Sequence, residues 1–216
     1  MLLALDTSTP VTTVALHDGS AVVVQRTAVD AMRHGEVLAP LIEQLLAEAG
    51  TSRRELGGIA VGVGPGPFTG LRVGVVTANT LGHVLGIPVY GVCSLDAIAA
   101  ATGPEVSSPF LVVTDARRKE VYWARYTGPF TRVDGPHVDR PDAIAERGWA
   151  ELPVAGSGAE LYPEAFGPRV GPRDPSAGVL AGLVAQGRAP TLDPIPLYLR
   201  RPDASPPGIR KPVSRH

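Results

Sequence analysis

The sequence predicts a duplicated α/β fold, in which two βββαβα lobes enclose a cleft. The order of strand-like and helix-like segments in the first half repeats in the second half. An aspartate closes the first strand each time, in Leu-Ala-Leu-Asp at 3–6 and Val-Val-Thr-Asp at 112–115. A Gly-x-Gly triplet follows the fourth strand each time, at 62–64 and 156–158. These matches indicate one lobe architecture used twice.

In the first half, short apolar segments rich in β-branched residues predict a meander of three strands. Asp18-Gly19 predicts the hairpin turn between the second and third strands. Apolar side chains then recur at three-to-four spacing, which predicts an amphipathic helix. The expected elements are strands at 2–5, 11–16 and 21–25, a helix at 36–50, a strand at 59–63, a helix at 69–85, a strand at 88–92 and a helix at 94–101.

A proline-containing break at 103–109 separates the halves, after which the pattern starts again. The second half is expected to hold strands at 110–114, 120–126 and 131–137, a helix at 141–149, a strand at 152–155 and a helix at 176–186. We therefore expect a first lobe over 1–104, a second lobe over 105–198 and a basic, proline-rich tail over 199–216. The tail is a solvated extension or an arm that contacts RNA phosphate or an acidic partner.

Composition excludes several classes of protein. The chain has 216 residues, a hydrophobic fraction of 44% and a formal net charge of -1, which suits a globular core and not a nucleic-acid coat. No run of eighteen apolar residues exists, so no membrane span is expected. The single cysteine, Cys93, excludes an internal disulfide and is expected to be a small core residue. We expect a cytoplasmic protein.

The duplicated layout is that of the actin-like, sugar-kinase and Hsp70 ATPase architecture, which is ribonuclease H-like. In that architecture the turn after each first strand holds phosphate with a carboxylate and small residues. The first turn here has Asp6, Thr7 and Ser8, and the second has Asp115, but neither contains glycine. Long charged side chains fill the second turn. We therefore expect degenerate phosphate turns, no bound cofactor and no metal site.

The most distinctive stretch is the motif loop at 64–72, Gly-Pro-Gly-Pro-Phe-Thr-Gly-Leu-Arg. Its glycines and prolines predict a rigid corner between a buried strand and a helix, with Thr69 at the N-cap. Such a corner either holds an anion at the helix N-terminus or only shapes a surface. The residues assigned to this loop are Gly64, Pro65, Gly66, Phe68, Thr69 and Arg72.

The helix after the motif loop carries small residues at every fourth position, so they share one face. Interior glycine costs a helix about 0.5–1 kcal/mol relative to alanine, which requires some compensation. Close packing of another element against the stripe would supply it, and that element is either the chain's own sheet or a partner helix. The stripe consists of Gly70, Gly74, Ala78 and Gly82.

Taken together, these motifs resemble the bacterial TsaB (YeaZ) family. The resemblance runs in order from residue 1 to about residue 200 and rests on the segments 5–9, 33–40, 64–72, 115–122 and 196–200. The motif loop is the most specific of them. Pro67 departs from the family's usual serine, and Gly35 from its common serine. Proline at position 67 has no hydroxyl group with which to bind an anion.

The resemblance implies a non-catalytic scaffold subunit for the formation of N6-threonylcarbamoyladenosine at position 37 of tRNAs that read codons beginning with A. The catalytic transfer belongs to the paralogue TsaD, which TsaB pairs with and activates, and the ATPase TsaE joins the pair. The free protein is a possible homodimer, and tRNA is met only through the complex. The paralogue binds its metal with two histidines, where this chain has Met32 and Glu36, so no metal is expected.

In the family, helices of the first lobe form the pairing surface. The residues expected to face the partner are therefore Val37, Leu41, Leu45, Gly70, Gly74, Ala78 and Gly82. Two competing hypotheses remain. A stand-alone ATPase or phosphotransferase would use Asp6 and Asp115 to hold a metal nucleotide in the cleft. A peptidase would need a nucleophile–base pair or zinc ligands, and the sequence shows neither pattern.

Overall fold

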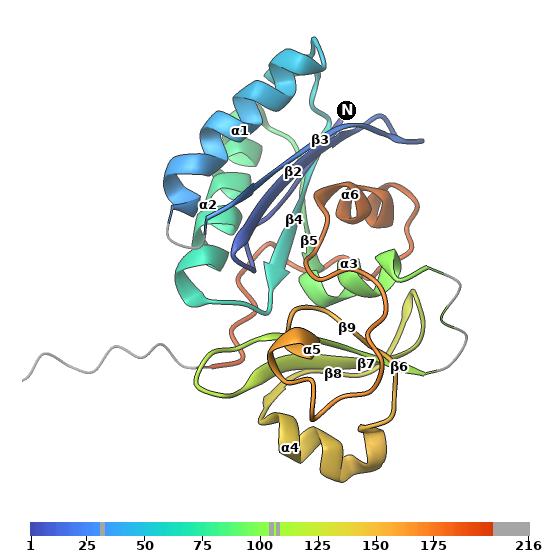
Figure 1. Cartoon of the computed structure of the whole chain (residues 1–216). Coiled ribbons are helices and arrows are strands. Elements are labelled where there is room, and N and C mark those ends of the chain that lie inside the picture. Colours follow the sequence, from blue (N-terminus) through green and yellow to red (C-terminus); the bar gives the residue numbers. More distant parts are fainter. Residues whose placement is uncertain (31–32, 104–105, 107–108, 201–216) are drawn as a thin grey trace, which may run out of the picture.

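A computed structural model describes the whole chain except residues 31–32, 104–105, 107–108 and 201–216. Its described part contains two separate sheets, one above the other in Figure 1. The first has the order β3-β2-β1-β4-β5 and the second the order β8-β7-β6-β9. In each, the first strand of the lobe pairs antiparallel with the second and parallel with the fourth. The duplicated α/β fold predicted from the sequence is thus confirmed.

The strands lie close to their predicted positions. Those of the first sheet are β1 Leu2–Asp6, β2 Val11–His17, β3 Val22–Val29, β4 Gly58–Gly64 and β5 Val89–Cys93. Those of the second sheet are β6 Phe110–Asp115, β7 Val121–Gly128, β8 Thr131–Asp139 and β9 Val154–Ala155. Strand β9 has only two residues, fewer than predicted, because the chain turns into a short helix directly after Gly156 and Ser157.

The helices of the first half are α1 His34–Glu48, α2 Phe68–Leu85 and α3 Ser94–Ala101. Those of the second half are α4 Pro141–Ile144, which continues as a π-helix over Ala145–Trp149, α5 Gly158–Leu161 and α6 Ala177–Ala185. The four-residue helix α5 and the 3-10 turn Arg53–Glu55 are too short to produce a hydrophobic period, and the sequence analysis missed both. Within the described residues, no helix has the length and hydropathy that crossing a membrane requires.

Helices α1 and α2 cover one face of the first sheet (Figure 1). The core between them is apolar and almost fully buried, and it includes Leu3, Leu5, Val14, Leu38, Leu45, Ile59 and Val75. At about 25 cal/mol for each Å² of apolar surface removed from water, such a core dominates the stability of the lobe. Helix α1 contributes its Leu38, Leu41, Leu45 row to this core, so that row faces inward.

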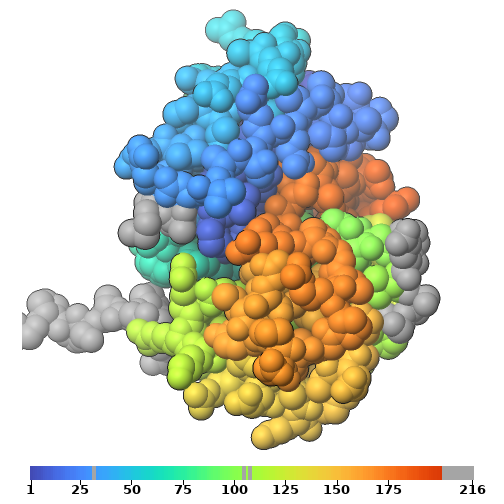
Figure 2. All heavy atoms as spheres, in the orientation of Figure 1, coloured from blue at the N-terminus to red at the C-terminus, as the bar shows by residue number. Residues whose placement is uncertain are grey.

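The last helix, α6, covers the opposite face of the first sheet, although the sequence places it in the second half. Its residues Ala177, Leu180 and Ala181 pack against Ala4 and Ala15. Figure 2 shows the chain around α6, in orange-red, lying against the blue first lobe. Helix α6, which we expected within the second lobe over 105–198, therefore packs on the first lobe. The predicted boundary at 104/105 lies outside the described residues.

Helix α3 makes the reciprocal contact. It ends the first half of the chain, but Leu95 and Ile98 pack with Phe110, Val112 and Tyr126 of the second sheet in one buried cluster. Each lobe is thus covered in part by a helix from the other half of the sequence. Local periodicity cannot reveal this exchange, because it specifies an apolar face and not the sheet that the face meets.

The small-residue stripe of α2 packs inside the chain. A Cβ added at Gly74 would lie 2.4 Å from Thr7 Oγ1, and one at Gly82 would lie 2.3 Å from Val89 Cγ2. The Thr7 hydroxyl donates to the Gly70 carbonyl at 2.7 Å and accepts from the Gly74 amide at 3.1 Å. The stripe therefore lets the β1–β2 turn and strand β5 approach the helix closely.

This packing corrects the expected partner-facing residues. Gly70, Gly74, Ala78 and Gly82 are buried, as are Leu41 and Leu45 of α1. Val37 alone of the seven is partly exposed. A buried side chain that already packs on its own sheet is not available to a partner, so the prediction for these six residues is wrong.

We expect Gly74→Ala to lower the free energy of unfolding by about 1–3 kcal/mol, because the added methyl group overpacks the contact with Thr7 and outweighs the better helix propensity of alanine. Urea unfolding of the purified chain measures this. The matched control is Thr80→Ala on the exposed face of the same helix, expected to change stability by no more than about 0.5 kcal/mol. Equal or greater stability of Gly74→Ala would show that the stripe is not closely packed.

Candidate functional site

The motif loop lies where strand β4 passes into helix α2, beside the β1–β2 turn. Gly64 has φ +99°, and a Cβ at Gly66 would lie 2.3 Å from the Ser8 carbonyl oxygen, so both positions require glycine. Helix α2 begins at Phe68 and its N-cap is Pro67, with no capping side chain. Thr69 therefore lies within the first turn, and its predicted N-cap role is wrong.

Asp6 is fully buried at the end of β1, and both carboxylate oxygens accept hydrogen bonds from the chain itself. Oδ1 accepts from the Ser8 amide at 2.7 Å and the Ser8 hydroxyl at 2.6 Å, and Oδ2 accepts from the Ser94 hydroxyl at 2.6 Å. Ser94 Oγ in turn accepts from the Gly64 amide at 3.2 Å. We call these four residues the Asp6 junction. It joins the ends of β1 and β4 to the start of α3.

Burial governs the chemistry of this carboxyl group. Desolvation raises the pKa of Asp6 above its ordinary value, and the three hydrogen bonds from Ser8 and Ser94 oppose that rise. A Cβ at Gly62 would lie 1.8 Å from Asp6 Oδ2, so glycine at 62 is what makes room for the carboxylate. Asp6 is therefore fully buried, and its two oxygens link the turn after β1 to the start of α3.

The second turn, over 116–120, has a costly backbone. Arg117, Arg118 and Lys119 have φ values of 62°, 55° and 61°, the left-handed region in which each L-residue costs roughly 1–2 kcal/mol. Asp115 Oδ1 accepts from the Arg117 amide at 2.7 Å, and backbone bonds link Ala116 to Glu120 and Glu120 to Arg117. The sequence indicated a turn without glycine, but no pattern in it revealed three successive left-handed residues.

The motif loop and the second turn meet around a cavity of about 170 Å³. The Phe68 ring stacks on Tyr198 with centroids 4.7 Å apart, and the Arg72 guanidinium lies 4.8 Å from the Phe68 centroid. The Tyr122 hydroxyl donates to the Gly66 carbonyl at 3.4 Å. The cavity is basic and aromatic, and its lining residues are Gly66, Pro67, Phe68, Ala116, Arg117, Arg118, Tyr122, Tyr198, Leu199 and Arg200.

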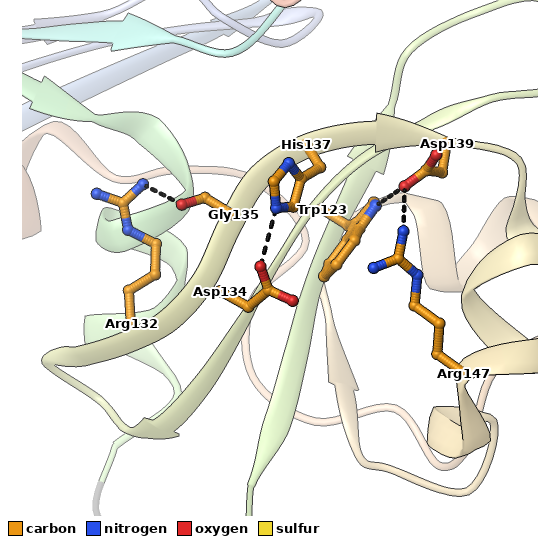
Figure 3. A network of polar contacts seen from close by, with 7 residues as sticks. All are labelled: Trp123, Arg132, Asp134, Gly135, His137, Asp139 and Arg147. Atoms are coloured by element: carbon orange, nitrogen blue, oxygen red, sulfur yellow. Dashed lines mark hydrogen bonds and ion pairs between the residues drawn. The ribbon is translucent and has the colours of Figure 1, made fainter.

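A second polar cluster joins the lobes through α3. Asp96 Oδ1 accepts from the Tyr126 hydroxyl at 2.7 Å and lies 3.3 Å from Arg132 Nε. Arg132 Nη1 also donates to the Gly135 carbonyl at 3.3 Å (Figure 3). Burial raises the pKa of the neighbouring Cys93 thiol to about 12, so it stays protonated, and the predicted core role of Cys93 is confirmed. Sequence reasoning missed this cluster, because its members come from three separate elements.

A network of side chains on the second sheet holds the α4 segment against strands β7 and β8. Trp123 is buried, and its indole Nε1 donates to Asp139 Oδ2 at 2.9 Å (Figure 3). Arg147, from the π-helix, pairs with the same carboxylate at 3.3 Å and lies over the Trp123 ring at 5.0 Å. These contacts fasten the α4 segment to strands β7 and β8.

On the outer surface of the first lobe, an apolar groove runs between α1 and α2, with a volume of about 320 Å³. We call it the α1–α2 groove, and its lining residues are Ala39, Ile42, Glu43, Arg53, Val76, Thr77, Thr80 and Leu81. Val76 is 58% exposed, and Val84, farther along the same helix, is 73% exposed. Large exposed aliphatic side chains beside a groove are typical of a protein–protein contact surface.

Comparison with known proteins adds a family to this geometry. The family model for TsaD, described as tRNA N6-adenosine threonylcarbamoyltransferase, matches residues 26–164. An uncharacterized protein of Mycobacterium tuberculosis is 46% identical over 210 residues, covering 95% of this chain and 94% of its own. The Escherichia coli protein named tRNA threonylcarbamoyladenosine biosynthesis protein TsaB is 31% identical over 172 residues, covering 76% of this chain and 74% of its own.

Solved structures agree with the sequence relatives. The structure of YeaZ from Pseudomonas aeruginosa is similar to this chain with a TM-score of 0.73 and 32% identity, over 92% of this chain and 99% of the other. Another solved structure, described as an uncharacterized protein with similarity to peptidase YEAZ from Pseudomonas aeruginosa, reaches a TM-score of 0.78 at 31% identity with the same coverage. The chain, which also matches the TsaD family model, therefore belongs to the TsaB (YeaZ) family.

Proposed function

We propose that this chain is a non-catalytic subunit in the formation of N6-threonylcarbamoyladenosine on tRNA, and that it pairs with a TsaD-like catalytic paralogue. Its relatives from Escherichia coli, Haemophilus influenzae and Bacillus subtilis are named as tRNA threonylcarbamoyladenosine biosynthesis proteins. The observation that carries the proposal is the α1–α2 groove, an apolar surface in which Val76 is exposed, with the exposed Val84 farther along α2.

The pairing surface is the outward side of α1 and α2, because the inward side of both helices is buried in the chain's own core. Among the lining residues of the α1–α2 groove, Ile42 is buried, Leu81 is half-buried and Val76 is exposed. Glu43 and Arg53, which also line the groove, form an exposed ion pair at 2.7 Å and add polar groups to its apolar surface. An apolar centre with a polar rim is the usual anatomy of a protein interface.

The state of the phosphate turns supports a non-catalytic role. Catalysis by a metal nucleotide would require the carboxylates of Asp6 and Asp115 to face a shared ligand. Asp6 is bonded to Ser8 and Ser94, and Asp115 is bonded to the Arg117 amide of its own turn. We propose that the active site of the assembly resides in the paralogue, that a TsaE-like ATPase joins the pair, that the free chain pairs with itself through the same groove, and that tRNA is met through the complex.

The runner-up function is a stand-alone ATPase or phosphotransferase, which the duplicated fold would permit. It requires measurable ATP turnover by the isolated chain that is lost in Asp6→Ala. One of the similar solved structures is described by its likeness to a peptidase, but no observation on the described residues of this chain favours that chemistry, and we do not propose it.

Val76→Asp is expected to weaken binding of the TsaD-like protein at least about tenfold, because it places a charge in the apolar surface of the groove. Isothermal titration calorimetry with the purified paralogue measures the affinity. The matched control is Leu161→Asp, which adds the same charge at a comparably exposed position, 52%, on α5. Equal affinities for wild type and Val76→Asp would remove the α1–α2 groove from the interface.

Asp6→Asn tests the structural role of the Asp6 junction through pH. Because the folded pKa of Asp6 lies above its ordinary value of 3.8, the carboxyl group stabilises the fold most below pH 3.8, and this contribution is lost as pH rises through the folded pKa. The stability of Asp6→Asn relative to wild type should therefore increase from pH 4 toward neutral pH, as measured by urea unfolding. A difference that does not change with pH would contradict the buried, desolvated carboxyl group.

A further inference from the structure

Residues 191–200 run from the first lobe to the second, along strand β5 at the edge of the first sheet. At the start of this segment, the Gly91 amide donates to the Leu192 carbonyl at 3.0 Å, and the Leu192 amide donates to the Gly91 carbonyl at 2.8 Å. A Cβ at Gly91 would lie 2.7 Å from the Asp193 carbonyl oxygen, so the strand has glycine where the segment crosses it. Figure 1 shows the segment in red, passing beside β4 and β5 toward the second sheet.

In its middle, the segment is fastened to helix α2 and to the end of β4. Asn79 Nδ2 donates to the Pro194 carbonyl at 2.8 Å, and the Leu197 amide donates to the Val63 carbonyl at 2.8 Å. Leu192 and Leu197 pack against both the first-lobe core and the cluster that α3 shares with the second sheet. The segment therefore closes the seam between the two cores.

At its end, the segment reaches the left-handed turn of the second lobe. The Arg200 guanidinium forms an ion pair with Glu120, and its Nη1 donates to the Ala116 carbonyl at 2.7 Å. Ala116 and Glu120 are the two residues whose backbone bond closes that turn. The Arg200 side chain is 25% exposed, so water screens this pair less than a fully exposed pair.

We propose that residues 191–200 form an inter-lobe strap, which holds the left-handed turn closed and fixes the opening of the cleft. One guanidinium group binds both ends of the turn, which offsets part of the cost of its three left-handed residues. The stack of Tyr198 on Phe68 then presses the motif loop against the same segment. Since Tyr198, Leu199 and Arg200 also line the basic cavity, the strap forms one wall of it.

Charge reversal tests the strap on the full-length chain. In Arg200→Glu, the ion pair with Glu120 becomes a repulsion, and we expect amide hydrogen exchange at Ala116 and Glu120 to become at least about tenfold faster. Exchange at Leu180 of α6, which bonds to Ser176 away from the strap, should stay unchanged. The double variant Arg200→Glu with Glu120→Arg restores opposite charges and should recover most of the protection. Unchanged exchange in the single variant, or no recovery in the double variant, would overturn the proposal.

A second experiment measures the distance between the two lobes. Spin labels at Val84→Cys on α2 and Leu161→Cys on α5 stand on exposed positions of opposite lobes, and the buried Cys93 does not compete for labelling. The labelled chain is diluted into unlabelled chain, so that only distances within one chain are measured. We expect one narrow distance distribution in the parent chain and a broader one after Tyr198→Ala combined with Arg200→Glu. An equally narrow distribution in both would show that the strap does not set the opening. Both experiments use the chain alone, so their outcome is independent of its proposed partner.

Discussion

The structure depends on one buried carboxylate. Asp6 holds the ends of two central strands and the start of α3 together, because its two oxygens accept from Ser8 and Ser94 and Ser94 accepts from Gly64. A buried carboxyl group without hydrogen-bond partners would destabilise the fold, so the fold depends on these donors and on the space left by Gly62. Because of the same hydrogen bonds, the Asp6 carboxyl group is not available to bind a metal nucleotide. The hydrogen bonds of Asp6 thus account both for the stability of this junction and for the proposed loss of catalysis.

Helix α2 separates the interior from the surface of the first lobe. The glycine face of α2 lies so close to Thr7 in the β1–β2 turn that a side chain at Gly74 would not fit. On the opposite face of the helix, Val76 and Thr80 are exposed. Close packing on the inner face makes the helix a rigid platform, and rigid surfaces lose less entropy when a partner binds. The proposed pairing surface therefore rests on the intramolecular packing that the small residues permit.

The sequence predicted most of the fold, because the strands and longer helices carry strong periodic patterns. It also located the motif loop and the turns that follow β1 and β6, as those depend on local residue chemistry. It failed where the answer depends on residues far apart in the chain. The spacing of Gly70, Gly74 and Gly82 predicts a close contact but not which element makes it, and the contact proved to be Thr7 and Val89. For the same reason, the sequence did not predict that α3 and α6 each pack on the sheet of the other half, nor the Asp96 cluster, nor the ion pair between Arg200 and Glu120.

The most direct test of the central claim is the mass of a mixture of this chain with the TsaD-like protein of the same genome, determined by light scattering alongside an ATP turnover assay of the chain alone. The account predicts a one-to-one complex and no ATP turnover by the isolated chain. The absence of a complex, together with ATP hydrolysis that Asp6→Ala abolishes, would contradict it and identify the chain as an enzyme in its own right.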